Sequence, residues 1–181
     1  MNMRVLVIGG TSGIGASIVK VFKDNGHEVT ATGRELDIGS ESARHHLVYL
    51  MNTADTIVNC AYSGSNQREL LFKAFDEYKD QNKIFINIES ANAWREGQLT
   101  VDQIAYVTDK LALVTARRHL QKLPRQMKII GICPATVDTK YNASKNIPKM
   151  KVDSVAIIIY NAVTTVLEYG IELSEIHMQA C

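Results

Sequence analysis

The sequence predicts a single α/β domain: a doubly wound parallel sheet with helices on both faces, in a three-layer α/β/α arrangement. Short apolar runs alternate with segments of helical periodicity from one end of the chain to the other. The apolar runs are continuous, which is typical of parallel strands that are buried on both faces. The length of 181 residues suits one domain over residues 1–181, and no linker or repeat divides it.

The elements follow one another in a regular order. The predicted strands are residues 3–8, 28–32, 56–58, 83–88, 127–132 and 171–178, with a very short further strand at 36–38. Helices are predicted between them from apolar positions at helical spacing: Ile14, Ile18, Val21 and Phe22; Leu47, Leu50 and Met51; Leu70, Leu71, Ala74, Phe75 and Tyr78; Ile104, Val107, Leu111 and Val114; and Val155, Ile158, Ile159, Ala162, Val163 and Val166. We expect the first helix to end at Asn25-Gly26, the second to be capped by Ser40, and the fourth to end near Pro124.

The composition is that of an ordinary globular protein. Hydrophobic residues make up 46% of the chain and charged residues 22%, which argues against disorder. Lys and Arg number 20 and Asp and Glu 19, so no charge excess points to nucleic acid or an anionic membrane. No apolar run approaches the roughly 20 residues that span a bilayer, and no signal peptide is expected. The three cysteines lack metal-ligand spacing, so we expect no metal site and a reducing, cytoplasmic location.

A glycine-rich segment joins the first predicted strand to the first helix. Its sequence is Gly9-Gly10-Thr11-Ser12-Gly13-Ile14-Gly15. Gly9 can make the tight turn, Gly13 can let the backbone approach a pyrophosphate, and Gly15 can let the helix pack close to the sheet. The helix N-terminus offers N–H groups and partial positive charge to phosphates. The segment predicts a Rossmann-like dinucleotide site; the alternative is a tight turn without a ligand.

The end of the second predicted strand bears on the choice of dinucleotide. Proteins that select NAD often place an acidic residue there, which binds the ribose 2′-hydroxyl. This chain has Arg34, whose planar guanidinium suits the 2′-phosphate of NADP. We therefore expect NADP(H) to be favoured over NAD(H), with Asp37 and Ile38 near the adenine. The alternative is a solvated arginine beside Glu35.

A tyrosine and a lysine lie one turn apart in the fourth predicted helix. Tyr106 and Lys110 occupy positions i and i+4, so the phenol and the ammonium share one face. A nearby ammonium lowers the pKa of a tyrosine, which makes the phenol a better general acid or base near neutral pH. Ser90 follows strand 83–88 and can hydrogen-bond a substrate carbonyl oxygen. Taken alone, the pattern also fits a surface tyrosine beside a lysine.

Together these segments resemble the short-chain dehydrogenase/reductase family. The glycine turn is similar to the family's T-G-x-x-x-G-x-G motif, with Ile8 where threonine is usual, and Tyr106 and Lys110 match its Y-x-x-x-K. The other similar segments are residues 55–61 (D-x-x-V-N-N-A-G), 86–90 (N-x-S-S) and 134–139 (P-G-x-V-x-T). The ordered set covers nearly the whole chain and is far more specific than any one motif.

The resemblance implies a role for each matched residue. Tyr106 would protonate the carbonyl oxygen or deprotonate the alcohol, Lys110 would lower the tyrosine pKa and hold the nicotinamide ribose, and Ser90 would orient and polarise the carbonyl. The hydride is the cofactor's chemistry. The residues expected to bind the cofactor are Gly9, Thr11, Ser12, Gly13, Ile14, Gly15, Arg34, Asp37, Ile38, Asn59, Cys60, Ala61, Tyr106, Lys110, Pro134, Val137 and Thr139.

The chain departs from the family pattern at several positions. Cys60 replaces the second asparagine of the strand-end motif, and Tyr62 replaces its glycine. No asparagine lies between residues 67 and 81, where the family carries a catalytic asparagine that supports a proton-relay water. Glu89 places a carboxylate beside Ser90. The chain is also short for this family, mainly in parts that face the substrate.

Two functions remain open on the sequence. The first is a cytosolic NADP(H)-dependent oxidoreductase that interconverts a small-molecule carbonyl and a secondary alcohol, favoured by the intact Ser90, Tyr106 and Lys110. The second is a dinucleotide-binding sensor or regulatory protein with little or no catalysis, favoured by the missing asparagine and by Glu89. The substrate is not indicated, although residues 91–99 and 141–150 would wall its pocket. The resemblance also implies a homodimer or homotetramer formed through the long helices.

Overall fold

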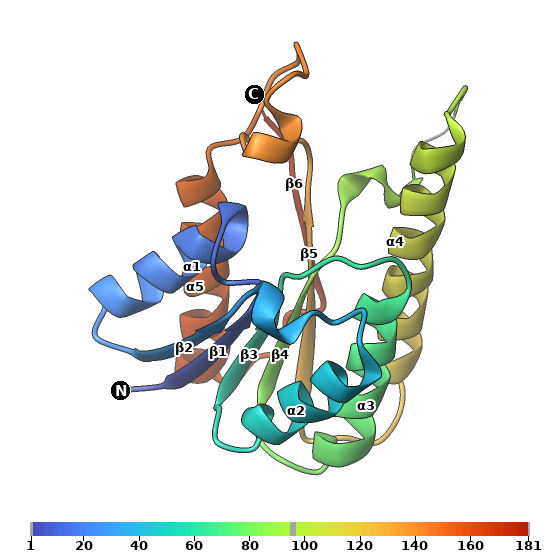
Figure 1. Cartoon of the computed structure of the whole chain (residues 1–181). Helices are drawn as coiled ribbons and strands as arrows, with labels where there is room; N and C mark the ends of the chain where they lie inside the picture. Colours follow the sequence, from blue (N-terminus) through green and yellow to red (C-terminus); the bar gives the residue numbers. More distant parts are fainter. Residues whose placement is uncertain (1, 95–96, 181) are drawn as a thin grey trace.

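The sheet has six parallel strands. The computed structural model describes residues 2–94 and 97–180, and its strands lie in the order β2-β1-β3-β4-β5-β6 (Figure 1). They are β1 (Arg4–Ile8), β2 (Glu28–Thr32), β3 (Thr56–Asn59), β4 (Ile84–Ile88), β5 (Lys128–Pro134) and β6 (Glu175–Met178). Each neighbouring pair is parallel. The chain order reverses between β1 and β3, so this junction is the switch point at which such sheets bind ligands.

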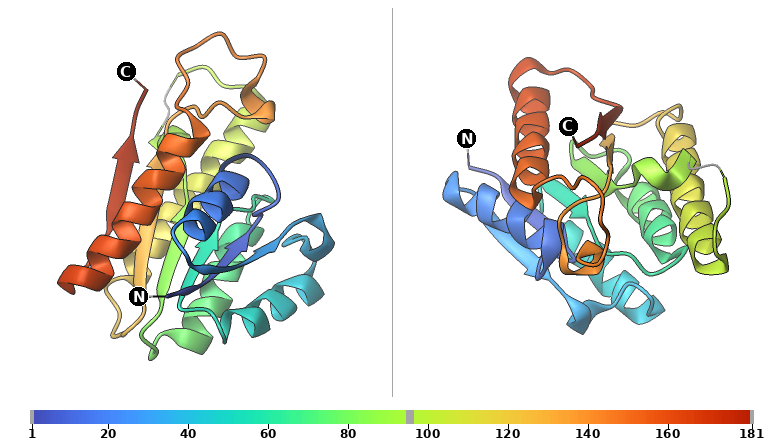
Figure 2. Two further views of the ribbon diagram at one scale, coloured as in Figure 1. Left: turned by 90° about the vertical axis from the view of Figure 1, so that its left-hand side faces the viewer. Right: turned by 90° about the horizontal axis from the view of Figure 1, so that it is seen from above.

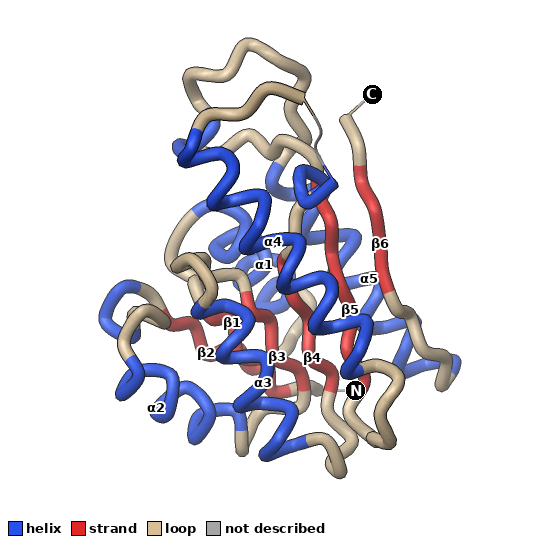
Figure 3. The backbone as a smooth tube through the Cα atoms, turned by 90° about the vertical axis from the view of Figure 1, so that its right-hand side faces the viewer, coloured by secondary structure: helices blue, strands red, loops and turns tan. Residues whose placement is uncertain are grey.

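Helices cover both faces of the sheet, which confirms the predicted doubly wound α/β fold. They are α1 (Gly13–Asp24), α2 (Glu41–Met51), α3 (Asn66–Tyr78), α4 (Val101–Leu120) and α5 (Val152–Tyr169). Helices α1 and α5 lie side by side on one face (Figure 2). Helices α2, α3 and α4 cover the opposite face (Figure 3). Three short 3-10 helices interrupt the loops: η1 (Arg34–Leu36), η2 (Ala91–Trp94) and η3 (Lys140–Asn142).

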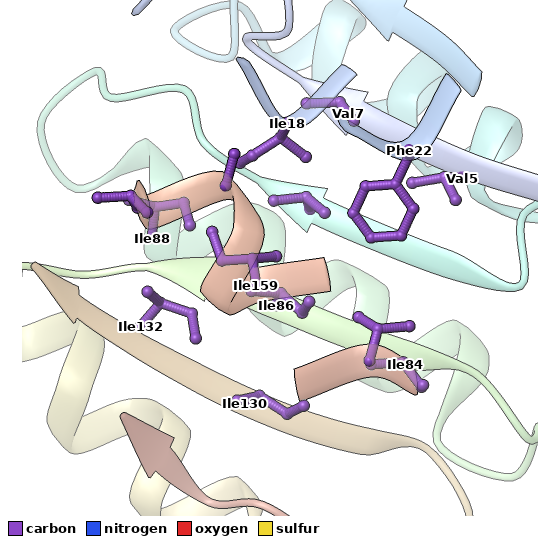
Figure 4. Close-up of a cluster of buried hydrophobic side chains, with 14 of the residues drawn as sticks. Val5, Val7, Ile18, Phe22, Ile84, Ile86, Ile88, Ile130, Ile132 and Ile159 are labelled. Atoms are coloured by element: carbon purple, nitrogen blue, oxygen red, sulfur yellow. The ribbon is translucent and has the colours of Figure 1, made fainter. Parts of the chain in front are cut away.

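Alternate residues of the strands supply two separate hydrophobic cores. Val5 and Val7 of β1 point toward α1 and α5, where they pack with Ile18 and Phe22 (Figure 4). Leu6 of β1 joins the other core with residues of α2, α3 and α4. These five side chains are at most 1% exposed, and burial of each contributes about 1.5–3 kcal/mol. The continuous apolar run of the first strand therefore reflects burial on both faces.

The predicted short strand at residues 36–38 is wrong. The chain instead forms η1 and a turn, in which Leu36 N–H donates to the Gly33 carbonyl oxygen at 3.2 Å and Ser40 N–H to the Asp37 carbonyl oxygen at 2.9 Å. The carboxylate of Glu35 accepts a hydrogen bond from Gly33 N–H, and that of Asp37 accepts one from Gly39 N–H at 2.9 Å. These local hydrogen bonds compete with strand pairing, as acidic and amide side chains often do in turns. In the described chain, β2 is consequently the last strand on this side of the sheet.

Most predicted helix boundaries agree with the structure. The hydroxyl of Ser40 accepts from Ala43 N–H at 3.4 Å, which confirms its role as the N-cap of α2. Helix α1 ends at Asp24, next to the expected Asn25-Gly26 signal. Helix α4 ends at Leu120, a few residues before Pro124, with a capping box at its start.

Helix α5 qualifies the expectation that no segment could span a bilayer. Its 18 residues have a mean hydropathy of 1.2, so length and composition alone would allow it to cross a membrane. However, Val155, Ile159 and Val163 are fully buried against α1 and the sheet. The other side of the helix is open, and Ile157, Leu167 and Tyr169 are exposed there.

Candidate active site

A long groove lies at the carboxyl edge of the sheet, at the switch point between β1 and β3. Its volume is about 1200 Å³. Its walls come from the loops that follow β1, β2, β3 and β5. The lining residues are Gly9, Thr11, Ser12, Gly13, Ile14, Gly33, Arg34, Leu36, Asp37, Ile38, Cys60, Ala61, Tyr62, Ser63, Asp138, Thr139, Lys140 and Val152. A groove of this size and place suits an extended ligand such as a dinucleotide.

Glycines make the turn at the floor of this groove possible. Gly9 has a φ of 79°, and a Cβ there would lie 2.8 Å from the backbone nitrogen of Ala61 on β3's following loop. A Cβ on Gly15 would lie only 2.1 Å from the carbonyl oxygen of Gly9. The turn is thus too tight for side chains at either position. Gly15 does not line the groove; it lets α1 start close beneath it.

The N-terminus of α1 points its positive end toward the groove. Ser12 is the N-cap residue, and its hydroxyl makes no capping hydrogen bond to the first turn. The first turn also carries no acidic residue. Its N–H groups and the helix dipole therefore suit an anion, and Ser12 and Gly13 both line the groove. The glycine cradle and this helix end together fit the pyrophosphate of a dinucleotide.

Basic and acidic side chains line the part of the groove that lies next to the carboxyl end of β2. Arg34 is exposed there, and Asp37 and Ile38 lie nearby in the lining, as the sequence analysis expected. The carboxylate of Glu35 is held by Gly33 N–H, and this hydrogen bond lowers the pKa of the carboxyl. Lys140 of η3 also lines the groove, and sequence reasoning missed it because the matched motif ends one residue earlier.

The end of β3 divides its predicted residues between the groove and the interior. Cys60 and Ala61 line the groove. Asn59 does not, because its side chain is fully buried and donates hydrogen bonds to the backbone oxygen of Gln67 and to the side-chain oxygen of Asn87, both at 3.1 Å. Alternate residues of a strand point to opposite faces, which places Asn59 away from the ligand side.

A smaller pocket of about 280 Å³ opens beside the groove. The two share Ile14, Cys60, Tyr62 and Thr139 as lining residues, so they are continuous. Its full lining is Ile14, Cys60, Tyr62, Ile88, Glu89, Ser90, Tyr106, Lys110, Pro134, Ala135, Val137, Thr139 and Asn142. The substrate pocket was expected to be walled by residues 91–99 and 141–150, of which residues 95–96 lie outside the described part of the chain. Of the described residues in these two stretches, Asn142 lines the pocket.

The structure brings Ser90, Tyr106 and Lys110 into this pocket from two different elements. Ser90 follows β4, is 5% exposed, and accepts a hydrogen bond from Asn92 N–H at 3.1 Å. Lys110 Nζ lies 5.9 Å from the centre of the Tyr106 ring. Both residues share the face of α4 that turns toward the sheet, as their i, i+4 spacing predicts.

Tyr62 packs directly on this pair. Its ring meets the Tyr106 ring edge-on with centroids 5.1 Å apart, and Lys110 Nζ lies 5.2 Å from its centre. Its hydroxyl donates to Asp109 at 3.0 Å. The residue stands where the resembling family has glycine, and in this chain its ring lines both the groove and the pocket.

Lys110 is buried, and neutral oxygens hold its ammonium. Nζ donates to the side-chain oxygen of Gln67 at 2.7 Å and to the carbonyl oxygen of Ile88 at 2.9 Å. Burial lowers the pKa of Lys110 to about 8, although nearby Cys60 and Glu89 act in the opposite direction. No motif in the sequence marks Gln67; its only signal is that it is a polar residue in the first turn of α3, directly after the β3 loop.

The Glu89 carboxylate, which departs from the family pattern, lines the pocket and pairs with Arg117. Arg117 Nε donates to Glu89 at 2.6 Å and Nη2 at 3.0 Å, and both side chains are fully buried. Burial disfavours charge on Arg117, but the Glu89 hydrogen bonds outweigh it and raise the arginine pKa. A Cβ on Gly131 would lie 2.4 Å from Arg117 Nε, so this glycine makes room for the pair.

The same arginine extends the network to β6. Arg117 and Arg118 both bind Glu175, and His177 contacts the same carboxylate. Burial opposes ionisation of Glu175, but hydrogen bonds from these three side chains outweigh it and lower its pKa to about 2. The carboxylate therefore anchors β6 to α4.

Three potential metal ligands meet at this network. Single ligand atoms of Cys133, Glu175 and His177 lie within 4.8 Å of one another. Burial raises the pKa of the Cys133 thiol, which opposes the thiolate that a metal requires. Arg117 and Arg118 already neutralise Glu175 and would repel a cation. The surroundings disfavour a metal ion here.

Trp94 serves as a packing anchor in the described structure. Its ring lies 5.0 Å from the His177 ring, and the Arg118 guanidinium lies 5.5 Å from its centre. Trp94 does not line the small pocket. It instead covers the charged network that ties β6 to α4.

Comparisons with solved structures place the chain in a known fold. An alcohol dehydrogenase from the archaeon Thermococcus sibiricus, complexed with 5-hydroxy-NADP, superposes with a TM-score of 0.74 and 16% identity over 99% of this chain and 97% of that one. A 3-alpha-hydroxysteroid dehydrogenase from Pseudomonas sp. B-0831, complexed with NADH, gives 0.74 and 18% over 97% and 94%. A short-chain dehydrogenase from Burkholderia cenocepacia J2315, complexed with NADP, gives 0.73 and 18% over 98% and 96%.

The fold is therefore that of the short-chain dehydrogenases/reductases, which confirms the sequence resemblance at the level of the fold. The match extends over nearly the full length of each solved chain. No protein-family model and no curated protein matches the sequence.

Proposed function

We propose that the protein is a short-chain dehydrogenase/reductase that uses NADP(H) to interconvert a carbonyl and a secondary alcohol. One observation carries the proposal: Ser90, Tyr106 and Lys110 line a single pocket that is continuous with the groove over the glycine turn. The residues of that groove fit a dinucleotide. The solved relatives of this fold include dehydrogenases complexed with NADP and with NADH.

The residues divide the reaction among them. Gly9, Ser12 and Gly13 would hold the pyrophosphate over the start of α1, and Val137 and Thr139 would border the nicotinamide end. When bound, the cofactor supplies or accepts the hydride. Tyr106 gives a proton to the carbonyl oxygen during reduction and takes it from the alcohol during oxidation.

The other two side chains adjust the charge around that proton. The Lys110 ammonium favours the phenolate of Tyr106 and thus lowers its pKa, and with a cofactor bound it would hold the nicotinamide ribose. Ser90 donates a hydrogen bond to the substrate oxygen, which polarises the carbonyl. Ile14, Ile88 and Val137 form an apolar part of the pocket wall, which lowers the local dielectric constant around these charges.

Arg34 supports the preference for NADP(H). Its exposed guanidinium lines the groove beneath β2, and Lys140 adds a second cation to the lining. Titration with NADPH and NADH, followed by nicotinamide fluorescence, tests the choice. We expect tighter binding of NADPH, and an Arg34→Leu variant that loses this preference; tighter binding of NADH by the parent protein contradicts the proposal.

The decisive experiment is Tyr106→Phe. We expect turnover of a carbonyl panel with NADPH to fall by about 100-fold or more, because the proton donor is lost. Affinity for NADPH should change little, since the phenol does not hold the pyrophosphate or adenine. Tyr49→Phe, on exposed Tyr49 of α2, is the matched control.

A catalytically weak dinucleotide sensor is the second candidate. It is favoured by Tyr62, whose ring lines both groove and pocket where the resembling family has glycine. This candidate gains if the parent protein binds NADPH yet turns over no member of the panel.

We also propose a cytoplasmic location and a homodimer or homotetramer. Cys60 and Cys133 are unpaired thiols, as a reducing compartment favours, while Cys181 lies outside the described residues. Helix α4 exposes Val101 and Ile104 on its outer face at 82% and 50%. Light scattering after size exclusion measures the assembly, and a monomer at all concentrations contradicts this part.

A further inference from the structure

The contacts of Gln67 are unusually complete for a glutamine. It lies in the first turn of α3, is 2% exposed, and uses both ends of its side-chain amide. Nε2 donates to the carbonyl oxygens of Asn59 at 2.9 Å and Ile88 at 3.0 Å. Because two carbonyls require donors, the amide orientation is determined, and Oε1 must face Lys110. The side chain thus joins the ends of β3 and β4 to α4.

The environment of the Lys110 ammonium explains why a neutral partner matters. Among the described residues, its two hydrogen-bond acceptors are the uncharged oxygens of Gln67 and Ile88. The charged or titratable groups that face it are Tyr106 and Asp109 on α4, Cys60 and Tyr62 after β3, Glu89 after β4 and Cys133 on β5. Asp109 accepts from Tyr62, and Glu89 is bound by Arg117.

We propose that Gln67 is a positioning residue of this site: its amide holds the Lys110 ammonium in the pocket and leaves the positive charge unneutralised. The inference rests on the proposed function, because the charge matters through its action on Tyr106. Two of the three ammonium hydrogens are used in these contacts, and Nζ lies 5.9 Å from the centre of the Tyr106 ring. A carboxylate in place of Gln67 would cancel the charge, and an apolar side chain would release the ammonium.

The first measurement uses the protein without cofactor. Because burial lowers the pKa of Lys110 to about 8, the unfolded chain binds more protons than the folded chain between this pH and the ordinary lysine pKa of ~10.4. Lys110 by itself should therefore make stability rise with pH through this window. The buried thiols of Cys60 and Cys133, whose pKa values burial raises, act in the opposite direction, so the contribution of Lys110 is the difference between the parent protein and Lys110→Met. Urea unfolding at a series of pH values measures the free energy of unfolding across this pH range. The part of the pH dependence that disappears in Lys110→Met belongs to this lysine.

Two variants of Gln67 should move this window in opposite directions. Gln67→Glu places a carboxylate beside the ammonium and raises the pKa of Lys110. The pH range in which Lys110 changes stability then begins at a higher pH and becomes narrower. Gln67→Met removes one acceptor, lowers the lysine pKa and starts the window at lower pH. Gln121→Met is the matched control, because Gln121 also accepts from a buried cation, Arg117, and donates to a carbonyl. It should keep the window of the parent protein.

The second measurement concerns catalysis with NADPH and the best carbonyl of the panel. In a plot of rate against pH, the activity falls at high pH as Tyr106 loses its proton. Gln67→Glu should raise the apparent pKa of this fall by about one unit, because the Lys110 charge no longer favours the phenolate. We expect kcat to fall about tenfold while KM stays nearly unchanged.

Unchanged stability windows in both Gln67 variants, equal to that of Gln121→Met, overturn the inference. The inference is also overturned if a Gln67 variant changes the pH range of the stability change but, in a protein that is active, leaves the pH dependence of the reaction rate unchanged. If the parent protein shows no turnover, the proposed function fails, yet the stability window still decides whether Gln67 holds Lys110.

Discussion

Arg117 and Lys110 are buried cations two turns apart on α4, and their partners differ in charge. Arg117 binds the carboxylates of Glu89 and Glu175. Lys110 binds the neutral oxygens of Gln67 and Ile88. A buried ion pair fixes structure because either partner alone would be costly. A buried ammonium with neutral acceptors keeps its charge available, which is what a group that acts on Tyr106 requires.

Replacing Arg117 by Met should destabilise the protein strongly. The Glu89 carboxylate would remain fully buried without its partner, and such losses cost about 3–5 kcal/mol. Urea unfolding measures the change. Arg118→Met, on a half-exposed arginine that shares Glu175, is the control and should cost less than about 1 kcal/mol. Equal losses in the two variants would show that burial of the Glu89 pair is not the cause.

At the scale of elements, the site is made where strands end and helices begin. The loop after β1 supplies the glycine turn, the loop after β4 supplies Ser90, and α4 supplies Tyr106 and Lys110. In parallel strands all carboxyl ends share one edge, so residues far apart in the chain converge there. A separate cavity of about 330 Å³ lies toward the opposite end of the strands, between β1, β2 and the end of α2, and Arg4, Glu28, Thr30 and Thr53 are among its lining residues.

The start of α1 should tolerate no side chain at Gly15. Gly15→Ala would place a Cβ 2.1 Å from the Gly9 carbonyl oxygen, so the helix must shift and the phosphate cradle with it. We expect NADPH affinity to fall at least ~10-fold and stability to fall by about 1–3 kcal/mol. Gly26→Ala is the control, because φ there is 81° and an added Cβ would meet no atom within 4 Å apart from its chain neighbours. It should cost about 1 kcal/mol and preserve NADPH binding.

The attachment of β6 should depend on pH through Glu175. Its pKa is lowered to about 2 in the folded protein, so its stabilising effect is present above the unfolded pKa of ~4.3 and lost as the pH falls toward 2. The effect is on the order of 2–3 kcal/mol. Glu175→Gln should flatten the acid limb of the unfolding curve. Glu77→Gln, on an exposed carboxylate of α3, controls for the loss of one acid.

At the scale of the whole molecule, one sheet separates two cores and carries one groove. Helices α1 and α5 close one core, and α2, α3 and α4 close the other (Figures 2 and 3). The groove is lined by residues from both sides of the switch point. The loop between β1 and α1 supplies one side, and the loop after β3 supplies the other. A ligand in the groove would therefore contact segments from both halves of the fold.

Binding of NADPH should stabilise the entire fold. A ligand that binds only the native state adds about 2.7 kcal/mol at 100 times its dissociation constant. We expect the thermal unfolding midpoint to rise with NADPH concentration, and to rise less with NADH at equal concentrations. Gly15→Ala should weaken the response. A midpoint that does not respond to either nucleotide contradicts the assignment of the groove.

The sequence by itself determined the features that depend on neighbouring residues. The glycine turn, the alternation of strands and helices, the Ser40 cap and the shared face of Tyr106 and Lys110 all follow from local spacing. These patterns place the candidate cofactor and catalytic residues at one edge of the sheet. Their physical basis is short-range: backbone conformation, helical period and burial of consecutive apolar residues.

Only the tertiary structure decided which polar groups meet across elements. The Gln67–Lys110 contact joins residues 43 apart in the chain, and the Glu89–Arg117 pair joins residues 28 apart. Neither pair has a local pattern, because each depends on how α3, α4 and the sheet pack. The same holds for Asn59, which faces the interior although its motif suggested the cofactor. Packing of whole elements therefore decides which buried charges are neutralised and which stay available for chemistry.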